Sequence, residues 1–128
     1  MKHLIGKIKN AIEVLEKECG HSLKICALVL REDPLEKWDI IVSEPWLNPK
    51  EMESYNIVSS KIQKQLDSSE LVQFSRIVIL DHNDPVVTYL RSLQTITNGG
   101  FEELKADELS ERFKFNIKKA FLLRSSEV

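Results

Sequence analysis

The 128-residue chain has few of the residues that mark unusual classes of protein. It contains only four glycines and four prolines, too few for a disordered or fibrous chain, and 42% of its residues are hydrophobic. This length and composition are typical of a globular domain that buries its core without disulfide or metal crosslinks. We therefore predict one globular domain over residues 1–128.

The sequence also lacks an excess of either charge. Eighteen basic residues against twenty acidic ones give a formal net charge of −2, so no overall attraction draws the chain to phosphate backbones or anionic lipid. No apolar run approaches the length of a membrane span, and the N-terminal stretch carries charges throughout its apolar pattern, unlike a signal peptide. We expect a cytoplasmic protein with neither a nucleic-acid partner nor a membrane partner.

Cysteine is scarce as well. The only two cysteines, Cys19 and Cys26, form no disulfide framework, and we expect reduced thiols. Together with His21 they supply zinc-ligand types, but a tetrahedral site needs a fourth ligand and the usual two-residue spacing is missing. Cys26 alternates with Leu28 and Leu30, where a free cysteine packs as a small hydrophobe. We expect neither a metal nor a cofactor.

The first part of the chain shows a helix pattern followed by two strand patterns. Residues 4–19 carry apolar side chains at helical spacing, and Gly20 is a natural stop. Residues 22–32 are apolar on both alternating sets, which is typical of a strand covered on both faces. After a polar link at Asp33-Pro34, residues 37–43 alternate again. The two runs predict a hairpin, with the second strand closer to the edge of the sheet.

A second helix is predicted from its capping signals. Asn48, Pro49 and Glu51 fit the N-cap, the first helical position and the acid of a capping box. Leu47, just before this cap, is expected to pack on Met52 as a hydrophobic staple.

The second half of the chain predicts one more strand and two more helices. Residues 77–80 are rich in β-branched side chains and predict an interior strand, after which Asp84-Pro85 opens a helix. Residues 108–123 carry apolar side chains at helical spacing among charges, which predicts an amphipathic closing helix. Residues 101–104 fit a short strand or a helical turn equally well, and the pattern over 95–107 predicts no definite structure.

This order of elements, α-β-β-α-β-α-(β)-α, predicts the fold class. It indicates an α/β (α+β) fold, in which a small mixed sheet of three to four strands is packed by four helices.

The stretch Asp81-His82-Asn83-Asp84 is the first candidate site. It lies where a predicted buried strand ends and a helix begins, so Asn83 or Asp84 can cap free N–H groups of the helix. The alternative is a small-molecule-binding or hydrolytic site at the carboxyl end of the strand, with His82 as acid or base and Asp81 orienting it. We favour the cap, and Asp81, His82 and Asp84 are the weak catalytic candidates.

Asp39 and Glu44 on the predicted hairpin suggest a metal-dependent nuclease-like domain. Some nuclease folds use two carboxylates on paired strands to hold Mg²⁺ and the lysine of a Glu-x-Lys motif to polarise the phosphate. Glu44 is instead followed by Pro45-Trp46, and the chain has no basic excess. The simpler interpretation is that Asp39 and Glu44 face solvent near the ends of an edge strand.

Three aromatic residues suggest the leading hypothesis. Trp38, Trp46 and Tyr55 gather around the second strand and its exit, where aromatic side chains can cover the core or anchor an interface. The sequence has no glycine-rich phosphate loop, no Gly-x-Ser-x-Gly elbow and no His-Glu-x-x-His motif. We therefore predict a non-enzymatic domain that binds another protein or itself, with a homodimer as one form and these aromatic residues as the interface.

Overall fold

The computed structural model describes residues 2–93, 95–96 and 100–126. Its centre is a mixed five-stranded sheet with the strand order β3-β2-β1-β5-β4. β1 pairs antiparallel with both β2 and β5, β4 pairs antiparallel with β5, and β2 and β3 are parallel. The strands are β1 (Ile25–Arg31), β2 (Trp38–Ser43), β3 (Phe74–Ile79), β4 (Glu102–Leu104) and β5 (Ile117–Ser125).

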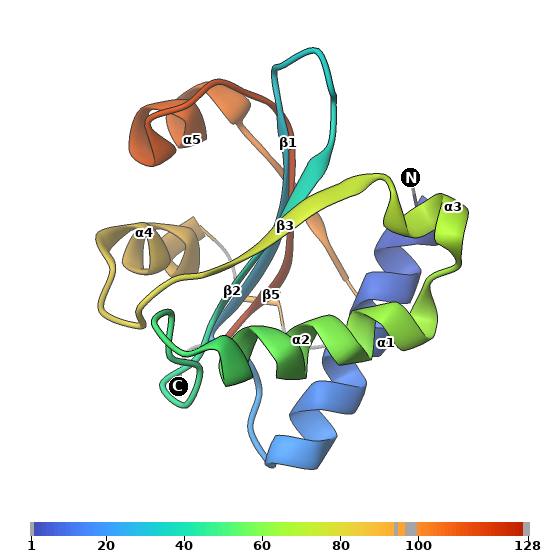
Figure 1. Ribbon diagram of the computed structural model, residues 1–128. Coiled ribbons are helices and arrows are strands. Elements are labelled where there is room, and N and C mark those ends of the chain that lie inside the picture. The colour runs from blue at the N-terminus through green and yellow to red at the C-terminus, as the bar shows by residue number, and fades with distance from the viewer. Residues whose placement is uncertain (1, 94, 97–99, 127–128) are drawn as a thin grey trace.

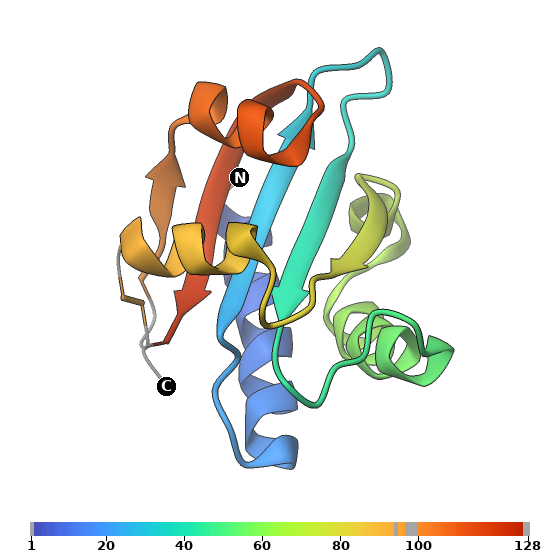
Figure 2. The same cartoon turned by 90° about the vertical axis from the view of Figure 1, so that its left-hand side faces the viewer.

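Helices cover both faces of the sheet (Figures 1 and 2). One face packs against α1 (Lys2–Cys19) and α2 (Met52–Gln65), with the short α3 (Ser68–Leu71) beside them. The other face packs against α4 (Pro85–Leu93) and α5 (Ala106–Phe113). The predicted α/β class with a mixed sheet is confirmed, with five strands and five helices in the described residues rather than three to four and four. None of these helices is long and apolar enough to cross a membrane.

Strand β1 explains why the sheet is buried on both sides. Cys26 and Leu28 belong to the core cluster under α1 and α2, whereas Ile25, Ala27 and Val29 belong to the cluster under α4 and α5. Successive side chains of a strand point to opposite faces, so a strand that is apolar at every position can only be stable between two layers. The prediction of a strand covered on both faces is confirmed.

The predicted positions of two strands within the sheet are wrong. β2 lies between β1 and β3 and is buried along its whole length, although we expected it near an edge. β3 is an edge strand, and Ser75 and Arg76 are exposed, although we expected an interior strand. The crossover through α2 carries β3 to the outer side of β2, and local pattern does not predict on which side a crossover lands.

The closing helix predicted over residues 108–123 is also wrong. α5 ends at Phe113, and β5 then runs through the middle of the sheet beside β1. Lys114 divides the two elements, because it adopts the left-handed conformation with φ 63° that ends the helix. Within the undecided segment 95–107, residues 102–104 form a strand, Ile96 bridges to Ser125, and residues 97–99 lie outside the described part.

The predicted start of the second helix is displaced by a turn. The Asn48 side chain accepts a hydrogen bond from the Lys50 N–H at 2.9 Å, in a separate turn, and α2 begins only at Met52. Leu47 is buried but Met52 is 73% exposed, so the predicted staple between them is wrong.

Candidate functional site

The Asp81–Asp84 segment forms the start of α4. Asp84 Oδ1 accepts a hydrogen bond from the Val86 N–H at 2.8 Å, and Asp81 Oδ1 accepts one from the Asn83 N–H at 2.9 Å. The capping interpretation is therefore confirmed for Asp84. The His82 imidazole lies 3.8 Å from the Asp81 carboxylate, with Asp81 exposed and His82 partly exposed. The catalytic interpretation of Asp81, His82 and Asp84 stays a prediction.

The three aromatic residues belong to the α1/α2 core, but Trp38 begins β2, whereas Trp46 and Tyr55 follow the end of that strand. Trp38 is only 7% exposed, and its ring stacks on Phe121 with the centroids 5.8 Å apart. Trp46 and Tyr55 are half-buried and pack against the same cluster, and the Tyr55 hydroxyl donates to the Pro49 carbonyl at 2.9 Å. The assignment of Trp38, Trp46 and Tyr55 to an interface stays a prediction, and Trp38 has little surface to contribute to it.

Asp39 and Glu44 do not form a metal site. They are five residues apart along extended chain, which separates them by about 16 Å, too far to share one ion. Among the residues that the structure describes, no group of three or more His, Cys, Asp or Glu side chains could hold a metal ion. The two carboxylates are therefore not brought together at one ion, and the nuclease hypothesis stays a prediction.

The expectation that both carboxylates face solvent is wrong. Asp39 is fully buried and Glu44 is 7% exposed. Burial raises the pKa of the Glu44 carboxyl, although a hydrogen bond from the Lys24 backbone opposes the shift. Asp39 lies inside because β2 is an interior strand between β1 and β3, and Glu44 directly follows the end of that strand.

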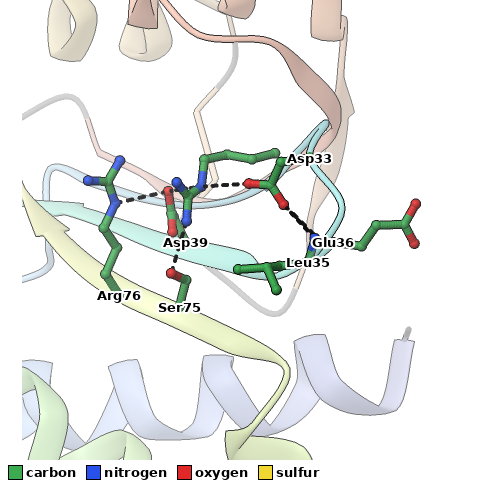
Figure 3. A network of polar contacts seen from close by, with 7 residues as sticks. Asp33, Leu35, Glu36, Asp39, Ser75 and Arg76 are labelled. Atoms are coloured by element: carbon green, nitrogen blue, oxygen red, sulfur yellow. Dashed lines mark hydrogen bonds and ion pairs between the residues drawn. The ribbon is translucent and has the colours of Figure 1, made fainter.

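Asp39 is the centre of a charge network across three strands, which we call the Asp39 network (Figure 3). Its Oδ2 lies 3.3 Å from Arg31 Nε on β1 and 3.2 Å from Arg76 Nε on β3. Arg31 also lies 3.9 Å from the Asp33 carboxylate and donates to Ser75 Oγ at 2.9 Å. Because each strand contributes a charged partner, the network ties β1, β2 and β3 together in one register.

A groove runs beside the edge strand β3, and we call it the β3 groove. It has a volume of about 370 Å³ and lies between β3 and the helices α2 and α3. Its apolar lining comes from Ile40, Ile62, Leu71, Phe74 and Ile77, and its polar lining from Ser59, Gln63, Ser75 and Arg76. An apolar floor with a polar rim is the usual pattern of a protein-binding surface.

The outer edge of β3 borders this groove. The Leu80 N–H donates to the Val42 carbonyl on β2 at 2.9 Å, so the alternation of backbone groups directs the Ile77 N–H and C=O away from β2. β3 is the last strand on its side of the sheet, and no further strand of the described residues pairs with it. An added strand can therefore bind there through backbone hydrogen bonds.

Sequence reasoning did not find the groove. We predicted β3 to be an interior strand, and an interior strand has no free edge to offer. Its exposed Ser75 and Arg76 were the available signal, since polar residues within a strand indicate that one side meets solvent.

Comparison with protein-family models, with curated proteins and with solved structures gives no match to this chain.

Proposed function

We propose that this chain is a non-enzymatic protein-binding domain that self-associates through the edge of β3. The observation that supports the proposal is the coincidence of an open strand edge with the apolar-floored β3 groove. Backbone hydrogen bonds to the edge would supply affinity, and a side chain placed in the groove would supply specificity.

A second copy of the chain is the occupant that this edge fits best. Two identical strands can always pair antiparallel about a two-fold axis, so the interface is complementary to itself without further design. Arg76 would otherwise place like charges across such an axis, but its guanidinium is already paired with Asp39. The edge is therefore close to neutral where the two copies would meet.

Sedimentation equilibrium over a range of protein concentrations tests this proposal. We expect the apparent mass of the wild-type chain to rise from 14.8 kDa toward twice that value as the concentration increases. Ser75→Lys should hold the chain at the monomer mass, because a lysine on an edge strand opposes strand pairing. Gln63→Lys, at the rim of the groove, should weaken association without touching the strand.

The matched control is Ser92→Lys, which adds the same charge at an exposed serine on α4 and should associate like the wild type. Circular dichroism would establish that all variants are folded. A wild-type chain that stays monomeric at every concentration, or a Ser75→Lys chain that associates normally, would contradict the proposal.

A further inference from the structure

A buried ion pair joins the first helix, α1, to the last strand, β5. Arg124 on β5 donates through Nη2 to Glu16 Oε1 on α1 at 2.8 Å, and the two side chains are only 4% and 11% exposed. The other Glu16 oxygen accepts a hydrogen bond from the Leu23 N–H at 2.7 Å. The carboxylate is therefore satisfied at both oxygens and is held in place by the start of the loop into β1.

A β-bulge directs Arg124 to this position. Leu122 lies opposite Ala27 and Arg124 lies opposite Cys26, so Leu123 is an extra residue in β5. Simple alternation would place Arg124 on the same face as Leu122, under α4 and α5. The extra residue turns it to the face of Cys26, under α1.

Arg124 has more donors than the protein gives it acceptors. Among the described residues, its buried Nε and Nη1 have no hydrogen-bond partner. Lys9 is a second cation close to Arg124, and it is only 7% exposed. Burial lowers the pKa of its ammonium group, and the positive charge of Arg124 lowers it further. The Lys9 ammonium donates to the Gly100 carbonyl and is influenced by Glu13 as well as Glu16, so Arg124 is the cation that lacks acceptors. Unsatisfied buried donors are costly, and this imbalance favours an additional anionic group.

An open hollow of about 440 Å³ lies over this pair, a volume in the range of small-molecule sites. Arg124 and Glu16 line it, together with the exposed residues Glu13, Lys17 and His21. Its wall therefore carries both acidic and basic groups. A phosphate dianion would meet two glutamates here, whereas a carboxylate next to an ammonium group would find an opposite charge for each of its ends.

We propose that this hollow binds a small zwitterion with the α-amino acid arrangement. The ligand carboxylate would lie over Arg124 with Lys17 beside it, and the ligand ammonium group would face Glu13 and Glu16. The proposal does not depend on self-association at β3, because the hollow lies between α1 and the end of β5 and shares no lining residue with the β3 groove.

A titration followed by ¹H–¹⁵N correlation spectra tests the proposal with the intact, isotopically labelled chain. The probes are glycine, acetate, methylammonium and inorganic phosphate. We expect glycine to shift the amides of Gly20, Ser22, Leu23 and Arg124 saturably in the millimolar range. Acetate should bind about tenfold more weakly, since it lacks the ammonium group, and methylammonium should give no saturable shift.

Three variants make the result specific. Arg124→Met should abolish the glycine-dependent shifts, and Lys17→Ala, at an exposed position that the fold tolerates, should weaken them several-fold. Lys64→Ala, an exposed lysine on α2 outside the hollow, is the matched control and should bind like the wild type. Three results would each overturn the proposal: no saturable shift with glycine, acetate or phosphate binding as tightly as glycine, or glycine binding unchanged in both Arg124→Met and Lys17→Ala.

Discussion

Two buried charge networks lie on opposite faces and at opposite ends of the sheet, and they satisfy their arginines differently. In the Asp39 network, Arg31 contacts two carboxylates and a serine hydroxyl, and Arg76 is 51% exposed, so water can reach it. Arg124 is 4% exposed and contacts only Glu16, with two donors left over. Both arrangements leave buried groups without a hydrogen-bond partner among the described residues: Arg31 Nε and Asp39 Oδ1 in the first, and Arg124 Nε and Nη1 in the second. Only the second leaves two donors on one arginine, and that arginine lines an open hollow.

This difference separates a stabilising contact from a binding site. A buried ion pair adds stability only when its remaining donors and acceptors are satisfied, and a buried donor without a partner costs about 1–3 kcal/mol. The Asp39 network joins three strands, so we expect it to stabilise the sheet, and its Ser75 and Arg76 also line the β3 groove. The Glu16–Arg124 pair lines a hollow, and the proposed ligand would supply acceptors for the unmatched donors of Arg124.

The largest effect is expected for Glu16→Ala, because it leaves the Arg124 guanidinium buried with no acceptor. We predict a loss of about 3–5 kcal/mol in the free energy of unfolding, measured by urea denaturation. Glu13→Ala is the matched control on the same helix, since Glu13 is exposed, and should change stability by less than about 0.5 kcal/mol. Equal losses in the two variants would show that Arg124 does not depend on Glu16.

A smaller effect, on chemical reactivity, tests whether the core around Cys26 is closed to solvent. Cys26 lies opposite Arg124, and burial raises the pKa of its thiol to about 12, although the nearby guanidinium opposes the shift. Burial also raises the pKa of Cys19, which is partly exposed. With a thiol reagent at about pH 8, Cys19 should react more slowly than free cysteine, and Cys26 should react only after unfolding. Equal rates at both cysteines in the folded chain would mean that the core around Cys26 is open to the reagent.

The sequence predicts those parts of the fold that depend on local signals. Residues 22–32 show their burial on both faces directly, and Asp84 before Pro85 marks the start of a helix. Prediction from local pattern fails where a helix and the strand that follows it both place apolar residues at helical spacing. Phe113, Ile117 and Phe121 fit a helix, yet the chain turns at Lys114, whose left-handed conformation is usually marked by glycine and is marked here by no special residue.

The hollow could not be predicted for a further reason. Glu16 and Arg124 are separated by 108 positions in the sequence, and they meet only because β5 lies beside β1 under α1. The bulge that turns Arg124 toward Glu16 breaks the alternation on which strand prediction relies. The same limit applies to the β3 groove, because which strand forms the edge is decided by pairing between distant segments.

The most direct test of the contrast is the same substitution in both networks, Arg31→Met and Arg124→Met, compared by urea unfolding without ligand. Arg31→Met removes one buried unsatisfied donor, Nε, but it leaves the fully buried Asp39 with one partner and removes the bond to Ser75, so we predict a loss of about 2–3 kcal/mol. Arg124→Met also removes two buried unsatisfied donors, which offsets the lost ion pair, so we predict a loss of less than about 1 kcal/mol. A loss for Arg124→Met that equals or exceeds the loss for Arg31→Met would contradict the account and make Arg124 a structural residue.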